Sequence, residues 1–213
     1  MVASFLIRAG SLEAASAPAT WNPAAKNATV TLSSSDLVAQ KTSTDNWAGV
    51  QATVGRSTGK YYFGIQQTGS PWDSANFWMV FGLSVAAGNF TNSHPGDTVF
   101  STNGLGLQGQ GTVHRNGMSA GSGSVGITTS ADLDTVNFAV DMDNGEIWVN
   151  YNGTYGGSQD PATRTNPHTT FTPGLTLFPS AAMYSEGTNY EHRAKLLIGA
   201  NLTTSPPSGY SSW

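Results

Sequence analysis

The clearest structural signal lies at residues 136–151, Val136-Asn-Phe-Ala-Val-Asp-Met-Asp-Asn144-Gly145-Glu-Ile-Trp-Val-Asn-Tyr151. Two runs of alternating apolar and polar residues flank Asn144-Gly145, and Asn-Gly supplies the positive φ angles of a type I′ hairpin turn. With Asn144 and Gly145 as a two-residue loop, one face carries the apolar pairs Met142–Ile147, Val140–Val149 and Phe138–Tyr151. We expect this face to lie in the core. The other face, with Asp143–Glu146, Asp141–Trp148 and Ala139–Asn150 paired, is expected to be solvated or to line a groove.

From Trp21 onward, short β-like runs alternate with Gly, Asn, Ser and Pro, which is typical of a β-sandwich or barrel. No run has the length and 3.6-residue period of a long helix. The sequence therefore predicts an all-β fold, and Trp213 predicts a packed tail. The predicted strands are 29–32, 37–41, 47–54, 60–66, 77–85, 136–142, 147–151, 181–184 and 193–198.

Composition narrows the functional classes. The 213 residues suit one all-β domain, with 38% hydrophobic and only 10% charged residues. The net charge is −4 and the basic residues are scattered singly, whereas a nucleic-acid-binding surface needs a clustered basic stripe. The absence of cysteine excludes disulfides, thiolate metal sites and thiol catalysis. The longest nearly apolar stretch, 77–87, is well short of the roughly 20 residues that span a bilayer. We expect neither a nucleic-acid partner nor membrane insertion.

Several motif matches fall between residues 88 and 130, a region rich in Gly, Ser, Thr and Asn. Gly-x-Gly-x-x-Gly occurs at 104–109 and 121–126, and Gly-x-Ser-x-Gly at 117–121. Both motifs need a strand before them and a helix after them, and no helix follows. We therefore predict extended loops over 88–130 without a dinucleotide or nucleophile site. The histidines, also too far apart for a metal site, are expected in loops or at the surface.

Carboxylates suggest two weaker alternatives. A glycosidase needs two carboxylates about 5–10 Å apart, and the pairs Asp132–Asp134 and Asp141–Asp143 are spaced to share a strand face. Residues 141–152 also resemble a calcium loop, but glycine falls at position 5 instead of 6 and Asn152 stands where Glu is needed. The hairpin accounts for the same residues without an ion. We expect no metal and no cofactor.

Aromatic residues in polar loops are the remaining functional signal. Trp72 with Asp73, Tyr155 and Tyr190 each stand among Gly, Ser, Thr, Asn, Asp or Glu. Such a ring can stack on a sugar or an apolar ligand patch while polar neighbours bind hydroxyl groups. The alternative is that each ring caps the core from its loop.

In order along the chain, several segments resemble a SPRY domain. They are 59–63 (Gly-Lys-Tyr-Tyr-Phe), 81–84 (Phe-Gly-Leu-Ser), 138–148 with Asn152-Gly153, and 177–181 (Leu-Phe-Pro-Ser-Ala). Residues 21–27 and 207–213 look like the edges of SPRY-like modules in bacteriophage virion proteins. The resemblance covers residues 21–213. It implies a concanavalin A-like sandwich of two antiparallel sheets, no intrinsic catalytic activity, and partner binding through loops at one end of the sandwich.

From this resemblance we expect a non-enzymatic virion surface protein on a tail fibre, baseplate or head decoration, serving host-surface adhesion or structural decoration. Residues 1–20 would form an N-terminal arm for attachment to other virion proteins or for oligomerisation, and residues 21–213 the sandwich. The expected partners are virion proteins, a host glycan or receptor, and further copies of the chain. Two alternatives remain, a cellular SPRY-type protein-interaction module and a glycan hydrolase on the same sandwich.

Overall fold

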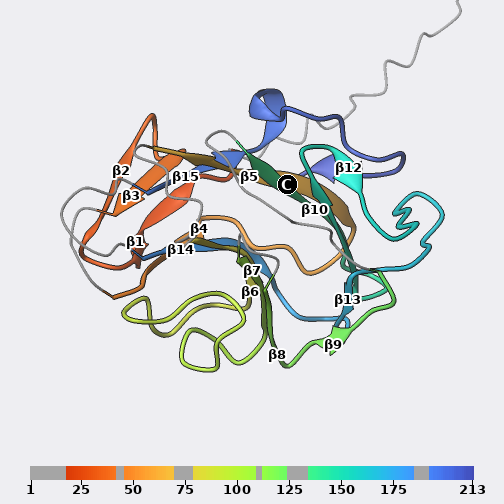
Figure 1. The fold of residues 1–213 in the computed structure, drawn as a ribbon, viewed down its shortest axis with the longest axis horizontal. Coiled ribbons are helices and arrows are strands. Elements are labelled where there is room, and N and C mark those ends of the chain that lie inside the picture. Colours follow the sequence, from red (N-terminus) through yellow and green to blue (C-terminus); the bar gives the residue numbers. More distant parts are fainter. Residues whose placement is uncertain (1–17, 42–45, 70–78, 109–111, 124–133, 185–191) are drawn as a thin grey trace, which may run out of the picture.

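The computed structural model describes residues 18–41, 46–69, 79–108, 112–123, 134–184 and 192–213. These residues form two β-sheets that lie face to face (Figure 1). Within them, the one helical element is a short 3-10 turn, η1 (Gly199–Asn201). No described helix is long and apolar enough to cross a membrane. The predicted all-β sandwich with two antiparallel sheets is confirmed.

Sheet A has six antiparallel strands. In spatial order they are β1 (Trp21–Lys26), β4 (Ala48–Ala52), β14 (Phe178–Met183), β6 (Met79–Ser84), β7 (Gly104–Gln108) and β8 (Val113–Asn116).

Sheet B contains the central hairpin. Its main path is β2 (Val30–Ser33), β3 (Val38–Lys41), β15 (Arg193–Leu197), β5 (Lys60–Thr68), β10 (Thr135–Asp141), β11 (Glu146–Tyr151), β13 (Thr169–Thr170) and β9 (Ser119–Ala120). Two short strands join it, β12 (Thr154–Tyr155) beside β11 and β16 (Ser211–Ser212) parallel to β5. All nine predicted strands are present, with ends that differ by a few residues.

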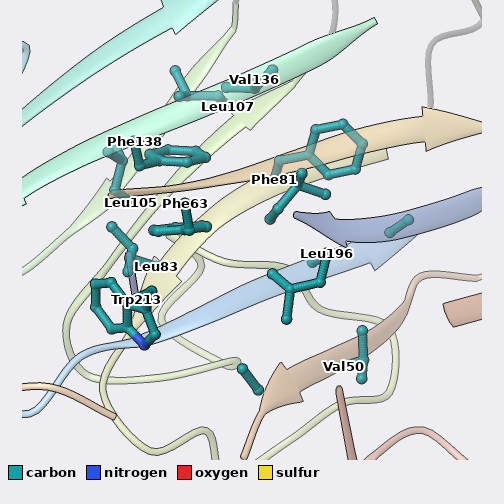
Figure 2. Packing of buried hydrophobic residues seen from close by; sticks show 14 of the residues in the cluster. Val50, Phe63, Phe81, Leu83, Leu105, Leu107, Val136, Phe138, Leu196 and Trp213 are labelled. Atoms are coloured by element: carbon teal, nitrogen blue, oxygen red, sulfur yellow. The ribbon is translucent and has the colours of Figure 1, made fainter. Parts of the chain in front are cut away.

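The inner faces of the two sheets enclose one apolar core. Phe63 and Phe138, paired in register across β5 and β10, have stacked rings with centroids 4.9 Å apart. Figure 2 shows these rings near Leu105 from the opposite sheet and Trp213 from the chain's end. Trp213 is 3% exposed, so the predicted packed tail is confirmed.

The 136–151 hairpin forms, but with a register other than the predicted one. Asp141 pairs with Glu146, so the loop is the four residues 142–145. Gly145 has a φ of +68°, but the φ of Asn144 is not positive. A type I′ turn needs a positive φ at both positions. The Asp141 carboxylate explains the wider loop, because it accepts bonds from the backbone N (3.1 Å) and Nδ2 (2.9 Å) of Asn144. The register differs by two residues, so every side chain keeps its predicted face.

The prediction of extended loops over 88–130 is wrong in part. Residues 104–108, which carry the start of a Gly-x-Gly-x-x-Gly match, form β7 inside sheet A, and β8 and β9 follow. The glycines there permit close backbone packing. A Cβ on Gly106 would lie 2.0 Å from the carbonyl oxygen of Pro95. The glycine content of this strand therefore reflects close approach of a neighbouring loop and not a mobile segment.

Candidate functional site

Three of the connections between the two sheets begin and end at the same end of the sandwich. In sheet A, Met183 at the end of β14 pairs with Ala48 and Met79, the first residues of β4 and β6. In sheet B, Arg193 at the start of β15 pairs with residues at or near the ends of β3 and β5. The connections β3–β4, β5–β6 and β14–β15 therefore all leave and enter the sheets here. We call this the loop end.

A cluster of aromatic and basic side chains occupies the loop end. The ring centroid of Trp47 lies 5.6 Å from that of Tyr184 and 5.1 Å from that of His94. His94 lies 4.3 Å from His114, and Lys41 Nζ is 5.8 Å from the centre of the Tyr184 ring. We call these five residues the loop-end cluster. Since Lys41 belongs to sheet B and Tyr184 follows a strand of sheet A, the cluster joins both sheets.

The cluster is suited to binding a partner without further ordering. Its four rings are half-buried, so each is held by neighbours while part of its surface faces solvent. Burial lowers the pKa of His114, His94 lowers it further, and Asp97 acts in the opposite direction, so the neutral imidazole is favoured. Rigid aromatic side chains with one polar edge are typical anchors of protein interfaces.

Three of the four predicted ligand contacts, Trp72, Asp73 and Tyr190, lie outside the described residues. The described residues next to their segments are Gly69, Met79, Tyr184 and His192, and they flank the loop-end connections.

The fourth predicted ligand contact, Tyr155, lies on β12 instead. It packs against the second, smaller apolar cluster, and its hydroxyl is buried with no hydrogen-bond partner. Burial raises the pKa of Tyr155. Its role in ligand binding stays a prediction.

Sequence reasoning did not single out the loop-end cluster. The alternation pattern predicts Trp47 and Tyr184 at the ends of strands. The histidines are predicted in loops or at the surface. Their common feature in the sequence is that each aromatic residue directly adjoins a predicted connection between strands. Which connections meet at the same end depends on strand order, which the sequence does not specify.

The outer face of the hairpin was predicted to be solvated or to line a groove, but away from the turn it is buried, whereas Asp143 is exposed and Glu146 is half-buried. Ala139 and Trp148, directly opposite each other on β10 and β11, are fully buried. Tyr210 of the C-terminal segment packs over them together with Tyr62 of β5. Trp148 Nε1 donates to the carbonyl oxygen of Thr165, at 2.7 Å. The sequence alone does not distinguish a polar strand face that another segment covers from one that faces water.

Two histidines lie in loops, as one of the two predicted alternatives has it, but they are buried and not at the surface. His168 is 3% and His192 is 6% exposed. Burial lowers the pKa of each to about 4, and the nearby cations Arg115 and Lys41, respectively, lower it further. Arg115 of β8 donates to Thr169 Oγ1 (2.7 Å) and lies 3.3 Å from His168 Nε2, so this group connects the two sheets.

The opposite end of the sandwich carries charged side chains, and Lys60 Nζ there lies 5.7 Å from the centre of the Tyr210 ring. The Asp141 side chain is fully buried and lies 3.0 Å from Lys60 Nζ. Arg164 pairs with Glu146 at 2.8 Å. Burial acts to raise the pKa of Asp141, but hydrogen bonds from Asn144 and Lys60 outweigh it, and the net shift is downward. Among the residues that the structure describes, no three His, Asp or Glu side chains are placed to hold a metal ion.

No family model and no curated protein matches the sequence. The fold, however, matches the SPRY domain of human HERC1 with a TM-score of 0.57 and 15% identity, over 87% of this chain and 99% of that one. The fold is that of a SPRY domain.

Two further structures agree with this SPRY-like fold. The TRIM65 PSpry domain matches with a TM-score of 0.52 and 14% identity, over 84% of this chain and 89% of that one. Stonustoxin matches with a TM-score of 0.51 and 16% identity, over 85% of this chain but 27% of its own. These identities establish a shared architecture. The predicted SPRY resemblance is confirmed at the level of the fold.

Proposed function

We propose that this protein is a non-enzymatic binding module that recognises a protein partner through the loop-end cluster. The observation that carries the proposal is the position of four half-buried aromatic and imidazole rings where three inter-sheet connections of a SPRY-like sandwich begin and end. A partner can cover these rings at little cost in side-chain entropy because their neighbours already hold them.

The scaffold beneath the cluster supports this function. Trp47 precedes β4 and Tyr184 follows β14, and these two strands are paired neighbours within sheet A. Their separation is therefore set by the sheet and not by the flanking loops. Sites built on paired strands hold their geometry more closely than sites on loops alone.

The test is affinity capture from an extract, with the full chain as bait. Proteins retained by the wild type and by Arg164→Ala, a change at the opposite end, should be lost with Trp47→Ala and with Tyr184→Lys. Circular dichroism establishes that each variant is folded, and Tyr184→Lys alters the cluster without creating a cavity. If both loop-end variants retain the same proteins as the wild type, the binding surface lies elsewhere and the proposal is wrong.

A narrower form of the proposal places the protein on a virion surface, and it rests on the resemblance of residues 21–27 and 207–213 to bacteriophage modules. Residues 1–20 would attach it to virion proteins or to its own copies. The loops around Trp72, Asp73, Tyr155 and Tyr190 would then contact a host glycan or receptor. Mass spectrometry of purified particles should detect the chain. Its absence would leave a cellular interaction module as the function.

A further inference from the structure

Four Asn-Gly pairs occur in the chain, at residues 103–104, 116–117, 144–145 and 152–153. In such a pair the backbone nitrogen of the glycine can attack the side-chain carbonyl carbon of the asparagine, because glycine has no side chain to hinder the approach. The reaction needs a glycine N–H free of hydrogen bonds and an asparagine side chain that can turn toward it. The structure describes all four pairs, and they differ in both respects.

The pair Asn144-Gly145 is protected at both reacting groups. The backbone N–H of Gly145 donates to the carbonyl oxygen of Asp141 at 2.9 Å, and Gly145 is buried. Asn144 Nδ2 donates to a carboxylate oxygen of the same aspartate, also at 2.9 Å. Both bonds must break before the glycine nitrogen can reach the side chain of Asn144.

The pair Asn152-Gly153 is exposed but protected by more hydrogen bonds. The backbone N–H of Gly153 donates to Asn150 Oδ1 at 3.1 Å. The Asn152 side chain is fixed from two sides, since Oδ1 accepts the backbone N–H of Thr135 and Nδ2 donates to Asp134 Oδ1, both at 2.8 Å. Three bonds therefore oppose the reaction at this pair.

The pair Asn103-Gly104 is protected by sheet A. Gly104 is the first residue of β7 and is buried. It is paired with Ser84 of β6 on one side and with Asn116 of β8 on the other. Its backbone cannot turn toward the Asn103 side chain without leaving the sheet.

The pair Asn116-Gly117 differs from the other three. It lies where β8, an edge strand of sheet A, ends, and Gly117 is exposed. The N–H of Gly117 forms no hydrogen bond with any part of the chain that the structure describes. The Asn116 side chain is held by one bond, from Nδ2 to the carbonyl oxygen of Ser101. The attacking nitrogen is therefore free, and a single side-chain bond has to break.

We propose that Asn116 is a deamidation site, which converts to aspartate and isoaspartate before the asparagines of the other three pairs. The Gly117 nitrogen forms a bond to Asn116 Cγ, the bond from Cγ to Nδ2 breaks, and the amide proton of Gly117 leaves with the NH₂ group as ammonia. Water then opens the cyclic succinimide at either carbonyl. The new carboxylate has no hydrogen to donate to Ser101, so the bond from β8 to the segment before β7 is lost. This site does not depend on the proposed function.

The experiment is to incubate the folded full chain at mildly alkaline pH and to follow each pair by proteolytic digestion and tandem mass spectrometry. Asn116 should convert at least about tenfold faster than the other three asparagines, because their glycines must first be released from hydrogen bonds or from the sheet. A parallel sample in concentrated urea should show similar rates at all four pairs. Asn116→Gln should abolish the fast product and leave the rates at the other pairs unchanged.

Three results would overturn the proposal. One is that Asn103, Asn144 or Asn152 converts as fast as Asn116 in the folded protein. Another is that Asn116 converts in urea but not in the folded protein, which would show that its bond to Ser101 protects it. A third is that urea leaves the order of the rates unchanged, so that the neighbouring sequence and not the fold selects Asn116. Circular dichroism of the incubated sample establishes that the chain stays folded.

Discussion

The indole ring of Trp213 lies 5.2 Å from the ring of Phe63 and nearly perpendicular to it, so the last residue of the chain is part of the central core. Its Nε1 donates to the carbonyl oxygen of Val54 at 2.9 Å. Its backbone N–H donates to the carbonyl oxygen of Tyr62, also at 2.9 Å. The C-terminal segment thus contributes directly to the stability of the sandwich.

Trp213→Ala should destabilise the protein by about 3–5 kcal/mol, because it leaves a cavity between the sheets and an unpaired carbonyl oxygen. Urea unfolding followed by circular dichroism measures the loss. Val99→Ala, at an exposed position, is the matched control and should change the free energy of unfolding by less than about 0.5 kcal/mol. A loss below about 1 kcal/mol for Trp213→Ala would mean that the tail does not pack as described.

The buried carboxylate of Asp141 gives the second prediction. Asp141→Ala removes the partner of Lys60 and of Asn144, and it should cost about 3 kcal/mol of unfolding free energy. Lys60→Met should cost only about 1 kcal/mol, because the lysine side chain is 33% exposed and Asn144 still donates to the carboxylate. Thermal unfolding of both variants at pH 7 distinguishes them. Equal losses would show that the ion pair, and not the loop hydrogen bonds, is the main contribution of Asp141.

The strands could be predicted from the sequence because alternation and turn residues are local properties, as residues 60–66 and 147–151 illustrate. The burial of Trp148 could not, since it depends on Tyr210, which lies far along the chain and packs over it. β1 was missed because Pro23 and two alanines weaken its strand pattern. The loop-end cluster was missed because Trp47 and Tyr184 come together only through the pairing of β4 with β14.

Stability should fall as the pH is lowered from about 6.5 toward 4. His168 and His192 have a pKa of about 4 in the folded protein, below the ordinary value of 6.5, so the unfolded chain binds more protons in this range. Each histidine should remove about 1.5 kcal/mol between pH 6.5 and pH 5, where most carboxylates are still ionised. Urea unfolding at several pH values measures the slope.

The variant His168→Gln isolates one half of this effect. Glutamine does not titrate, so the variant should lose about half of the pH-dependent slope, although the contact with Arg115 weakens and the stability at pH 7 decreases. The double variant with His192→Gln should keep only a smaller slope, since the pKa of His114 is also lowered by burial. An unchanged slope in the double variant would assign the pH dependence to other groups.

Alanine substitutions at two glycines with positive φ distinguish the cost of backbone strain from the cost of steric contact. Gly174 has a φ of +92° with open space around a built Cβ, so Gly174→Ala should cost about 1 kcal/mol from strain alone. Gly145 has a φ of +68°, and its Cβ would lie 2.0 Å from the carbonyl oxygen of Phe171. That contact cannot relax cheaply, because the backbone N–H of Phe171 donates to the Gly145 carbonyl at 2.8 Å. Gly145→Ala should therefore cost at least about 3 kcal/mol in urea unfolding. Similar losses for both variants would mean that φ alone requires glycine at position 145.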